Sequence, residues 1–213
     1  MIAWRNAMLV AVAFSLAVRL LAAEPDDDAY RPHTPTLTYR LTHADDAADA
    51  EAIRASVQKL ASVSKIVFVP GAVQIRFDSH VVSYHQVAQA IADAGKARGK
   101  NFDPSLKLSI PEYAQGGNAV KVDAVLAGKR LNQRVHIELL DKARGDFLIR
   151  FLPLAVDPAE SAPQGFNGGH LHHPIHDAPP RGLGLNCDYE SSDTGQATDA
   201  TTTNDSKAKK SSP

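Results

Sequence analysis

The sequence contains very little cysteine and has no excess of charge of either sign. Of its 213 residues only Cys187 is a cysteine, which excludes an intrachain disulfide and every metal site built on paired thiolates. The 23 basic and 24 acidic residues leave a net charge of −1. We expect no nucleic-acid partner, because such proteins depend on a basic surface that neutralises phosphates. With 44% hydrophobic and 22% charged residues, the chain has the composition of one or two ordinary globular domains.

The chain also lacks an apolar run long enough to span a bilayer, although residues 1–23 have the pattern of an export signal. Arg5 precedes a twelve-residue apolar run over 7–18, and small residues follow before an acidic stretch. Spanning requires about 20 apolar residues, and Arg19 interrupts this run earlier. We therefore expect a cleaved signal, a periplasmic or secreted protein and no stable membrane span, with an uncleaved anchor as the alternative.

Two further segments have compositions that do not favour a packed core. Residues 24–35 combine prolines with an acidic run and are expected to form a flexible lead-in. Residues 191–213 contain Ser, Thr, Asp and Lys but no large apolar residue, and such a segment cannot bury enough surface to offset its ordering entropy. The folded part is then expected to consist of residues 36–112 and a second unit over 119–190.

Residues 36–112 have the hydrophobic periodicity of a β-α-β-β-α-β unit. Alternating apolar residues predict strands, and an apolar residue at every third or fourth position predicts helices. An acidic cluster precedes the first helical stripe of Ile53, Val57 and Leu60, and Ser83 is a suitable N-cap for the second helix. The expected strands are 36–42, 65–69, 72–77 and 106–110, and the second helix covers 84–94 and ends at Gly95.

Two parts of this unit resemble a known family. The stretch KLASVSKIVFVPGAVQIRF at 59–77, followed by VAQAIADAG at 87–95, is similar to heavy-metal-associated domains, which occur in copper chaperones, metal-transporting ATPases and mercury-binding periplasmic proteins. The resemblance implies an α+β fold of the ferredoxin-like βαββαβ type over 36–112. It also implies a protein that handles metal ions.

The family binds soft metals through a C-x-x-C pair at the start of the first helix, and this sequence has two aspartates there. Counting back from Val63 places the pair on Asp46 and Asp49. Carboxylates are hard ligands that do not retain Cu(I). Two hypotheses follow: a site altered for a harder cation, with His43 as a third ligand, or a lost site in which both aspartates serve the helix N-terminus.

The second unit is expected to begin with a β-meander. Segments 120–126, 134–140 and 147–152 are rich in β-branched and aromatic residues, and the last two are joined by a Gly-containing hairpin loop. The meander either extends the first sheet or forms a small separate one. His136 and Glu138 share a strand face. They are interpreted as metal ligands, as an acid/base pair or as residues of a solvated strand face.

Residues 163–184 form a Gly/Pro/His-rich segment with interleaved apolar residues, and we expect a structured loop. Because Pro174 favours an extended residue before it, the side chains of His170, His172 and His176 are expected to share one side. Their imidazoles suit Zn, Ni or Cu(II). The candidate metal-site residues, with Cys187 as a further contributor, are His170, His172, His173, His176 and Asp177. The alternative is a structured loop without a metal, whose histidines form hydrogen bonds to carbonyl groups or solvent, or bind a partner.

Three functions remain open from the sequence. The first is an exported, non-enzymatic protein that binds a divalent transition metal through the histidine segment. The second is a metal-free module that binds an envelope protein and has lost the family's metal site. The third is a metal-dependent hydrolytic enzyme, for which no catalytic residue is identified and only Glu138 or Glu160 could be nominated as a base.

Overall fold

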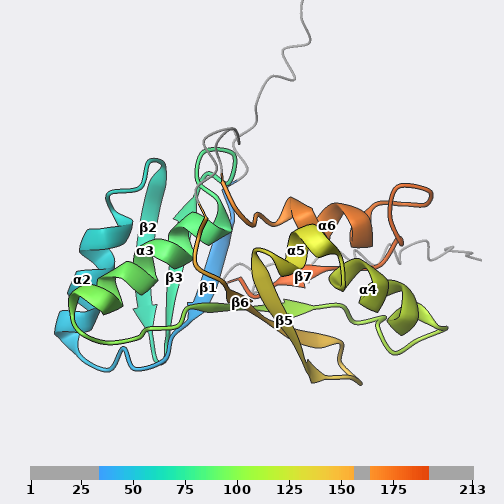
Figure 1. The fold of residues 1–213 in the computed structure, drawn as a ribbon, viewed down its shortest axis with the longest axis horizontal. Coiled ribbons are helices and arrows are strands. Elements are labelled where there is room, and N and C mark those ends of the chain that lie inside the picture. The colour runs from blue at the N-terminus through green and yellow to red at the C-terminus, as the bar shows by residue number, and fades with distance from the viewer. Residues whose placement is uncertain (1–33, 156–163, 192–213) are drawn as a thin grey trace, which may run out of the picture. The chain divides into compact units, whose positions relative to one another are not determined.

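The computed structural model describes residues 34–155 and 164–191 (Figure 1), and these belong to one compact unit. The predicted export signal, nearly all of the lead-in and all but the first residue of the tail lie outside the described residues. None of the helices in the described part is both long and apolar enough to cross a membrane.

The first six elements form the expected βαββαβ unit. They are β1 (Thr36–Arg40), α2 (Ala47–Val57), β2 (Val63–Val69), β3 (Ala72–Phe77), α3 (Tyr84–Ala97) and β4 (Ser105–Ser109). The strand order is β2-β3-β1-β4, and every neighbouring pair is antiparallel. That order and these connections are those of the ferredoxin-like fold, so the predicted α+β fold class is confirmed.

Both helices of this unit begin at side-chain caps. Ser83 accepts a hydrogen bond from the Gln86 N–H, and the Gln86 side chain bonds back to the Ser83 N–H, which is a capping box. Helix α3 continues two residues beyond the predicted end at Gly95. That glycine is needed for packing, because a Cβ there would lie only 3.0 Å from the Lys100 carbonyl and the Phe102 ring.

The second unit extends the first sheet rather than forming its own. Strands β5 (Val135–Asp141) and β6 (Asp146–Phe151) form a hairpin, and β6 pairs with β4. The sheet order becomes β2-β3-β1-β4-β6-β5, and the short β7 (Asp188–Tyr189) also pairs with β4. All these pairs are antiparallel, so β4 belongs to both units and no boundary near residue 112 divides the sheet.

The expected strand at 120–126 is wrong, because this segment is the helix α4 (Asn118–Leu126). Its alternating valines suggested a strand, but Val122, Val125 and Leu126 also have the i, i+3, i+4 spacing of a helix face. Val122 is fully buried, and the other two pack partly against the core. The meander is therefore reduced to the β5–β6 hairpin, preceded by the single-turn α5 (Lys129–Asn132).

The expected extended conformation of the histidine segment is also wrong. Residues Gly169–His176 form the helix α6, with Pro174 inside it. The deciding signal is Leu171 and Ile175, which are spaced i, i+4 and are both 0% exposed. Burying this apolar stripe against the rest of the protein outweighs the preference of the residue before a proline for extended backbone.

An aromatic cluster joins residues 164–191 to the first unit. The Tyr84 ring at the start of α3 lies edge-on to Phe77, Phe166 and Tyr189, with centroid separations of 5.8, 6.3 and 5.3 Å. Such edge-to-face pairs are stabilising beyond the area they bury. The buried residues of both units form one continuous core.

Candidate functional site

Asp49 lies in the first turn of α2 and is 0% exposed. Its carboxylate accepts hydrogen bonds from Lys100 Nζ and Arg98 Nε, both at 2.6 Å. The backbone N–H groups of Asp45 and Asp46 donate to it as well, at 3.1 and 3.4 Å. Burial by itself would raise the pKa of this carboxyl, but the lysine, the arginine and the two N–H groups together hold it well below its usual range.

Asp46 is the N-cap of the same helix. Its carboxylate accepts from the Asp49 N–H at 2.7 Å, which completes a capping box and lowers the pKa of Asp46, and the bond from Lys100 lowers it further. Lys100 and Arg98 lie 3.3 and 3.5 Å from the other oxygen of Asp46. Both aspartates thus take part in the hydrogen bonding at the N-terminus of α2.

A metal ion does not fit this end of α2. Two cationic side chains already neutralise the carboxylates, and a metal cation would have to displace them or be repelled by them. His43, the third ligand of the first hypothesis, is an exposed residue with a φ of 57°. The chain has one cysteine in all, so no thiolate pair can form here either. We derive no metal chemistry from Asp46 and Asp49.

Helix α6 carries two histidines on the face beside its buried stripe, where His172 is half-buried and His176 is exposed. Leu171 and Ile175 point into the core. His172 follows Leu171 and His176 follows Ile175, so these two histidines lie one turn apart on a neighbouring face of the helix. Their ring centroids are 4.5 Å apart, with an angle of 37° between the rings. Partial burial lowers the pKa of His172, and the rings of His176 and His173 lower it further, against the opposite influence of Asp177 and Asp188.

His173 and Asp177 form a second pair on α6. The His173 Nδ1 lies 3.5 Å from an Asp177 carboxylate oxygen, again at i, i+4 spacing. The His173 ring stands edge-on to His172, with centroids 6.0 Å apart. Four of the five predicted metal-site residues therefore lie near one another at the C-terminal end of α6 and its C-cap, with His173 and His176 exposed and His172 and Asp177 half-buried.

His170 is separated from the other histidines and bound elsewhere. Its ring stacks on Phe166 with centroids 5.9 Å apart, and its Nε2 lies 3.0 Å from an Arg134 NH group. The Asn167 N–H donates to its Nδ1 at 2.8 Å, and the Asn167 carbonyl lies 3.0 Å from the same nitrogen. The expected convergence of His170, His172 and His176 depended on extended backbone and does not occur in the helix.

Cys187, the further contributor that the sequence suggested, is a buried free thiol. It is 2% exposed, and burial, with a smaller effect from Asp188, raises the pKa of its thiol to about 12. Within residues 34–155 and 164–191, no three or more His, Cys, Asp or Glu side chains are grouped so that they could hold a metal. What α6 offers is a pair of imidazoles with a carboxylate nearby, rather than a complete ligand set.

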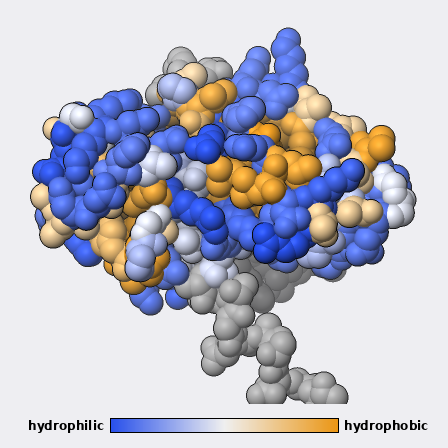
Figure 2. Space-filling view, turned by 90° about the horizontal axis from the view of Figure 1, so that it is seen from below, coloured by the Kyte–Doolittle hydropathy of each residue, from blue (hydrophilic) through white to orange (hydrophobic). Residues whose placement is uncertain are grey.

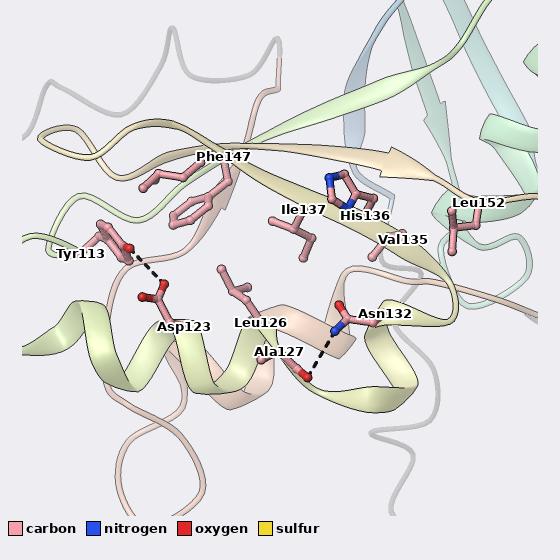
Figure 3. Close-up of a pocket in the computed structure, with 11 residues that line it drawn as sticks. Tyr113, Asp123, Leu126, Ala127, Asn132, Val135, His136, Ile137, Phe147 and Leu152 are labelled. Carbon is pink, nitrogen blue, oxygen red and sulfur yellow. Dashed lines mark hydrogen bonds between the residues drawn. The ribbon is translucent and has the colours of Figure 1, made fainter.

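A groove that the sequence did not indicate lies between the β5–β6 hairpin and helix α4. It encloses about 600 Å³. Figure 3 shows Val135, Ile137 and Phe147 reaching from the strands towards α4, from which Leu126 points back. At one end the Tyr113 hydroxyl donates to the Asp123 carboxylate at 3.0 Å. Sequence reasoning missed the groove because it treated 120–126 as a strand and so placed no helix opposite the hairpin.

His136 and Glu138 lie on β5 as expected, and both are exposed. Their neighbour across the hairpin is Arg150, which is opposite His136 in the register and 3.8 Å from the Glu138 carboxylate. Glu160, the other residue nominated as a base, lies outside the described residues.

Of three comparisons with known proteins, the one with solved structures gives matches. A scan against protein-family models finds no match, and a search of curated proteins finds none. A solution structure described as a copper-ion-binding protein from Bacillus anthracis is 24% identical, with a TM-score of 0.31, and the match covers 35% of this chain and 99% of that one.

Two similar structures come from the P-type ATPase CopA of Bacillus subtilis. Its water-soluble region is 14% identical with a TM-score of 0.33, over 58% of this chain and 80% of that one. Its N-terminal soluble domains are 12% identical with a TM-score of 0.30, and the match covers 63% of this chain and 85% of that one. At these identities and scores we take no ligand or residue role from the three structures. The ferredoxin-like fold is established by the strand order and connections described above.

Proposed function

We propose that this chain is an exported, non-enzymatic protein that binds a divalent transition metal through His172 and His176. The observation that carries the proposal is the 4.5 Å separation of the centroids of these two rings on one face of α6, where His172 is half-buried and His176 is exposed. Two imidazoles at i, i+4 on one helix face are an established way to hold Zn, since both rings can turn their nitrogens towards one ion. Imidazole is a suitable ligand for Zn, Ni and Cu(II).

The surroundings of the pair support metal binding rather than hydrogen bonding alone. A ligating imidazole must be neutral, and the lowered pKa of His172 favours the neutral ring. Asp177, beside His173 at 3.5 Å, supplies a carboxylate that could orient a ring or a bound water. The helix is fixed by Leu171 and Ile175, so the ligand positions are set by the core.

Two protein ligands leave several positions on the ion open to water or to another molecule. Structural zinc sites use four protein ligands, so we expect binding here to be exchangeable. A role in carrying or buffering a metal outside the cytoplasm fits such a site and the expected export signal at residues 1–23. It differs from the family's soft-metal chemistry, which needs thiolates.

Titration calorimetry of the tag-free protein with Zn, Ni and Cu(II) salts tests the proposal. We expect about one ion per chain, and binding should be lost when His172 and His176 are both changed to Ala. Two matched controls should bind as the parent does: His43→Ala, which is far from α6 in sequence and exposed, and His170→Ala, whose ring is engaged by Arg134. No heat of binding from the parent with any of the three metals would overturn the proposal.

The metal-free interaction module remains the second candidate, because of the groove beside β5. Its walls are apolar at Leu126, Ile137 and Phe147, and Leu139 and Leu152 on its rim are 40% and 37% exposed. Exposed apolar area of this kind is typical of binding surfaces. A parent protein that binds no metal but retains an envelope protein, with loss of retention on Leu139→Lys, would favour this candidate over the first.

A further inference from the structure

The His172–His176 pair supplies only part of the ligand set that zinc takes in a closed protein site. Structural zinc sites are tetrahedral and use four protein ligands. Within residues 34–155 and 164–191, no third His, Cys, Asp or Glu side chain completes a group that could hold a metal. The remaining ligands of an ion on α6 therefore come from water or from outside the described part of this chain.

The ring nitrogens of this pair are open to an incoming ion. His170 is engaged by Arg134, and His173 lies beside Asp177. In the part of the chain that the structure describes, no hydrogen bond or ion pair holds a ring nitrogen of His172 or His176. Because His176 is exposed and His172 is half-buried, an ion held by both rings lies at the surface.

A second copy of the chain offers the ligands that are missing. Each copy presents the same two imidazoles one helical turn apart, on a helix whose position is fixed by Leu171 and Ile175. A two-fold axis through the ion brings two such pairs together, and a self-complementary contact of this kind is the usual arrangement of a symmetric dimer. Four imidazoles around one ion suit the tetrahedral preference of zinc better than the tetragonal preference of Cu(II).

The surface of α6 lacks the apolar area that would hold two copies together without a metal. None of the large apolar side chains that are exposed in the described part of the chain lies on this helix. They are Val81, Val120, Leu139, Leu140 and Leu152. Figure 2 shows apolar surface on the lower side of the view in Figure 1, whereas α6 lies near its upper side. Association through α6 is therefore expected to depend on the ion.

The charges near the pair strengthen this dependence. Asp177 and Asp188 both act on the His172 ring and favour a positive charge there. Two copies that meet at α6 bring their carboxylates towards one another, which is unfavourable in the absence of a cation. A divalent ion between the two copies offsets that repulsion.

We propose that one zinc ion joins two copies of this chain through the His172–His176 pair of each copy. This inference rests on the proposed function, because it uses the same two histidines, and it adds the metal and the partner. The ion is shared when zinc is scarce. When zinc is in excess, each pair can hold an ion of its own, so saturation still corresponds to about one ion per chain.

Sedimentation velocity of the tag-free protein at increasing zinc concentration tests the inference. The protein concentration is kept above the dissociation constant that calorimetry gives. We expect a monomer in the presence of a chelator, the largest dimer fraction near about half an ion per chain, and monomer again in excess zinc. A dimer held by apolar contacts would not show this rise and fall.

Single substitutions identify the bridging residues. His176→Ala should abolish the zinc-dependent dimer, because each copy then keeps one imidazole of the pair. Its side chain is exposed, so the fold should be retained, and circular dichroism verifies this. His173→Ala, at an exposed position on the same helix, and His136→Ala, at an exposed position on β5, are the matched controls and should form the dimer as the parent does.

The possible failures separate this inference from the proposed function. Zinc binding by a protein that stays monomeric at every zinc ratio would overturn the shared site and leave the metal site on α6 intact. Absence of zinc binding would overturn both. A zinc-dependent dimer that His176→Ala affects no more than His173→Ala or His136→Ala would place the bridge elsewhere and overturn the inference.

Discussion

At the scale of single residues, His85 holds together two segments that are far apart in the sequence. It is 2% exposed, and its Nε2–H donates to the Leu152 carbonyl at 2.6 Å. Its Nδ1 accepts from the Phe166 N–H at 3.3 Å. The ring is therefore neutral. Burial lowers the pKa of His85 and the charge of Arg134 lowers it further, against the opposing effect of the Leu152 carbonyl.

We expect His85→Ala to lower the free energy of unfolding at pH 8 by about 2–4 kcal/mol. The variant loses buried packing and leaves the Phe166 N–H and the Leu152 carbonyl without their partner. Urea denaturation followed by circular dichroism measures the change.

The same substitution should alter how stability depends on pH. Because the pKa of His85 is lower in the folded state, its contribution is complete above the ordinary value of about 6.5 and declines as pH falls below it. The parent should thus lose stability between pH 7 and pH 5, and the difference between parent and His85→Ala should shrink over that interval. A difference that stays constant would contradict this assignment.

Asp49 is expected to contribute to stability and not to metal binding. Asp49→Asn should lower the denaturation midpoint, because Lys100 and Arg98 lose the charge that they neutralise. Since the pKa of Asp49 is depressed on folding, its contribution is present above about pH 4 and is lost as pH falls further. Metal titration of the variant should match the parent. A loss of metal binding would restore the hypothesis of a hard-cation site here.

At the scale of elements, α6 depends on two apolar side chains. Ile175 is 0% exposed, so Ile175→Ala should lower the free energy of unfolding by about 2–5 kcal/mol through lost burial and the cavity left behind. Val120→Ala, at a 76% exposed position, is the matched control and should change it by less than about 0.5 kcal/mol. Equal effects of the two substitutions would show that α6 is not packed as described.

The sequence predicted some elements well and others not at all, for physical reasons. The β2–β3 hairpin and helix α3 carry strong local signals: alternation around Pro70-Gly71, and a capping residue followed by a stripe of Val87 and Ile91. Helix α4 was missed because the short stretch VKVDAVL fits both the two-residue alternation of a strand and the 3.6-residue period of a helix. Helix α6 was missed because its local residues, including Pro174, disfavour a helix that burial of Leu171 and Ile175 then stabilises.

The candidate site was predicted in composition but not in geometry. The clustering of histidines at 170–176 is visible in the sequence, and it is this helix that holds the His172–His176 pair. The diversion of His170 depends on Arg134, which is 36 positions away. No local pattern indicates such a contact, because it is set by the packing of α6 beside the start of β5.

At the scale of the whole molecule, the two expected units share one sheet and one core. Strand β4 pairs with β1 at Leu106 and with β6 along its entire length. Tyr113, just after β4, packs edge-on to Phe147 of β6 with centroids 5.1 Å apart. The predicted boundary at 112–119 followed from a glycine-rich linker, but tertiary pairing crosses it.

A fragment of residues 34–112 is therefore expected not to fold stably. It would leave one side of β4 unpaired and would expose core residues that β6 and residues 164–191 cover, including the Tyr84 ring. Thermal unfolding monitored by circular dichroism should be cooperative for the full chain and broad or absent for the fragment. A cooperative transition in the fragment would mean that the βαββαβ unit is an independent domain.

The measurement that bears most directly on the function is calorimetric titration of the tag-free protein with Zn, Ni and Cu(II). Binding of about one ion per chain, abolished in the His172→Ala, His176→Ala double variant and retained in His170→Ala, is the result that we predict. Absence of binding in the parent, or equal binding by the folded double variant, would contradict the assignment of α6 as a metal site.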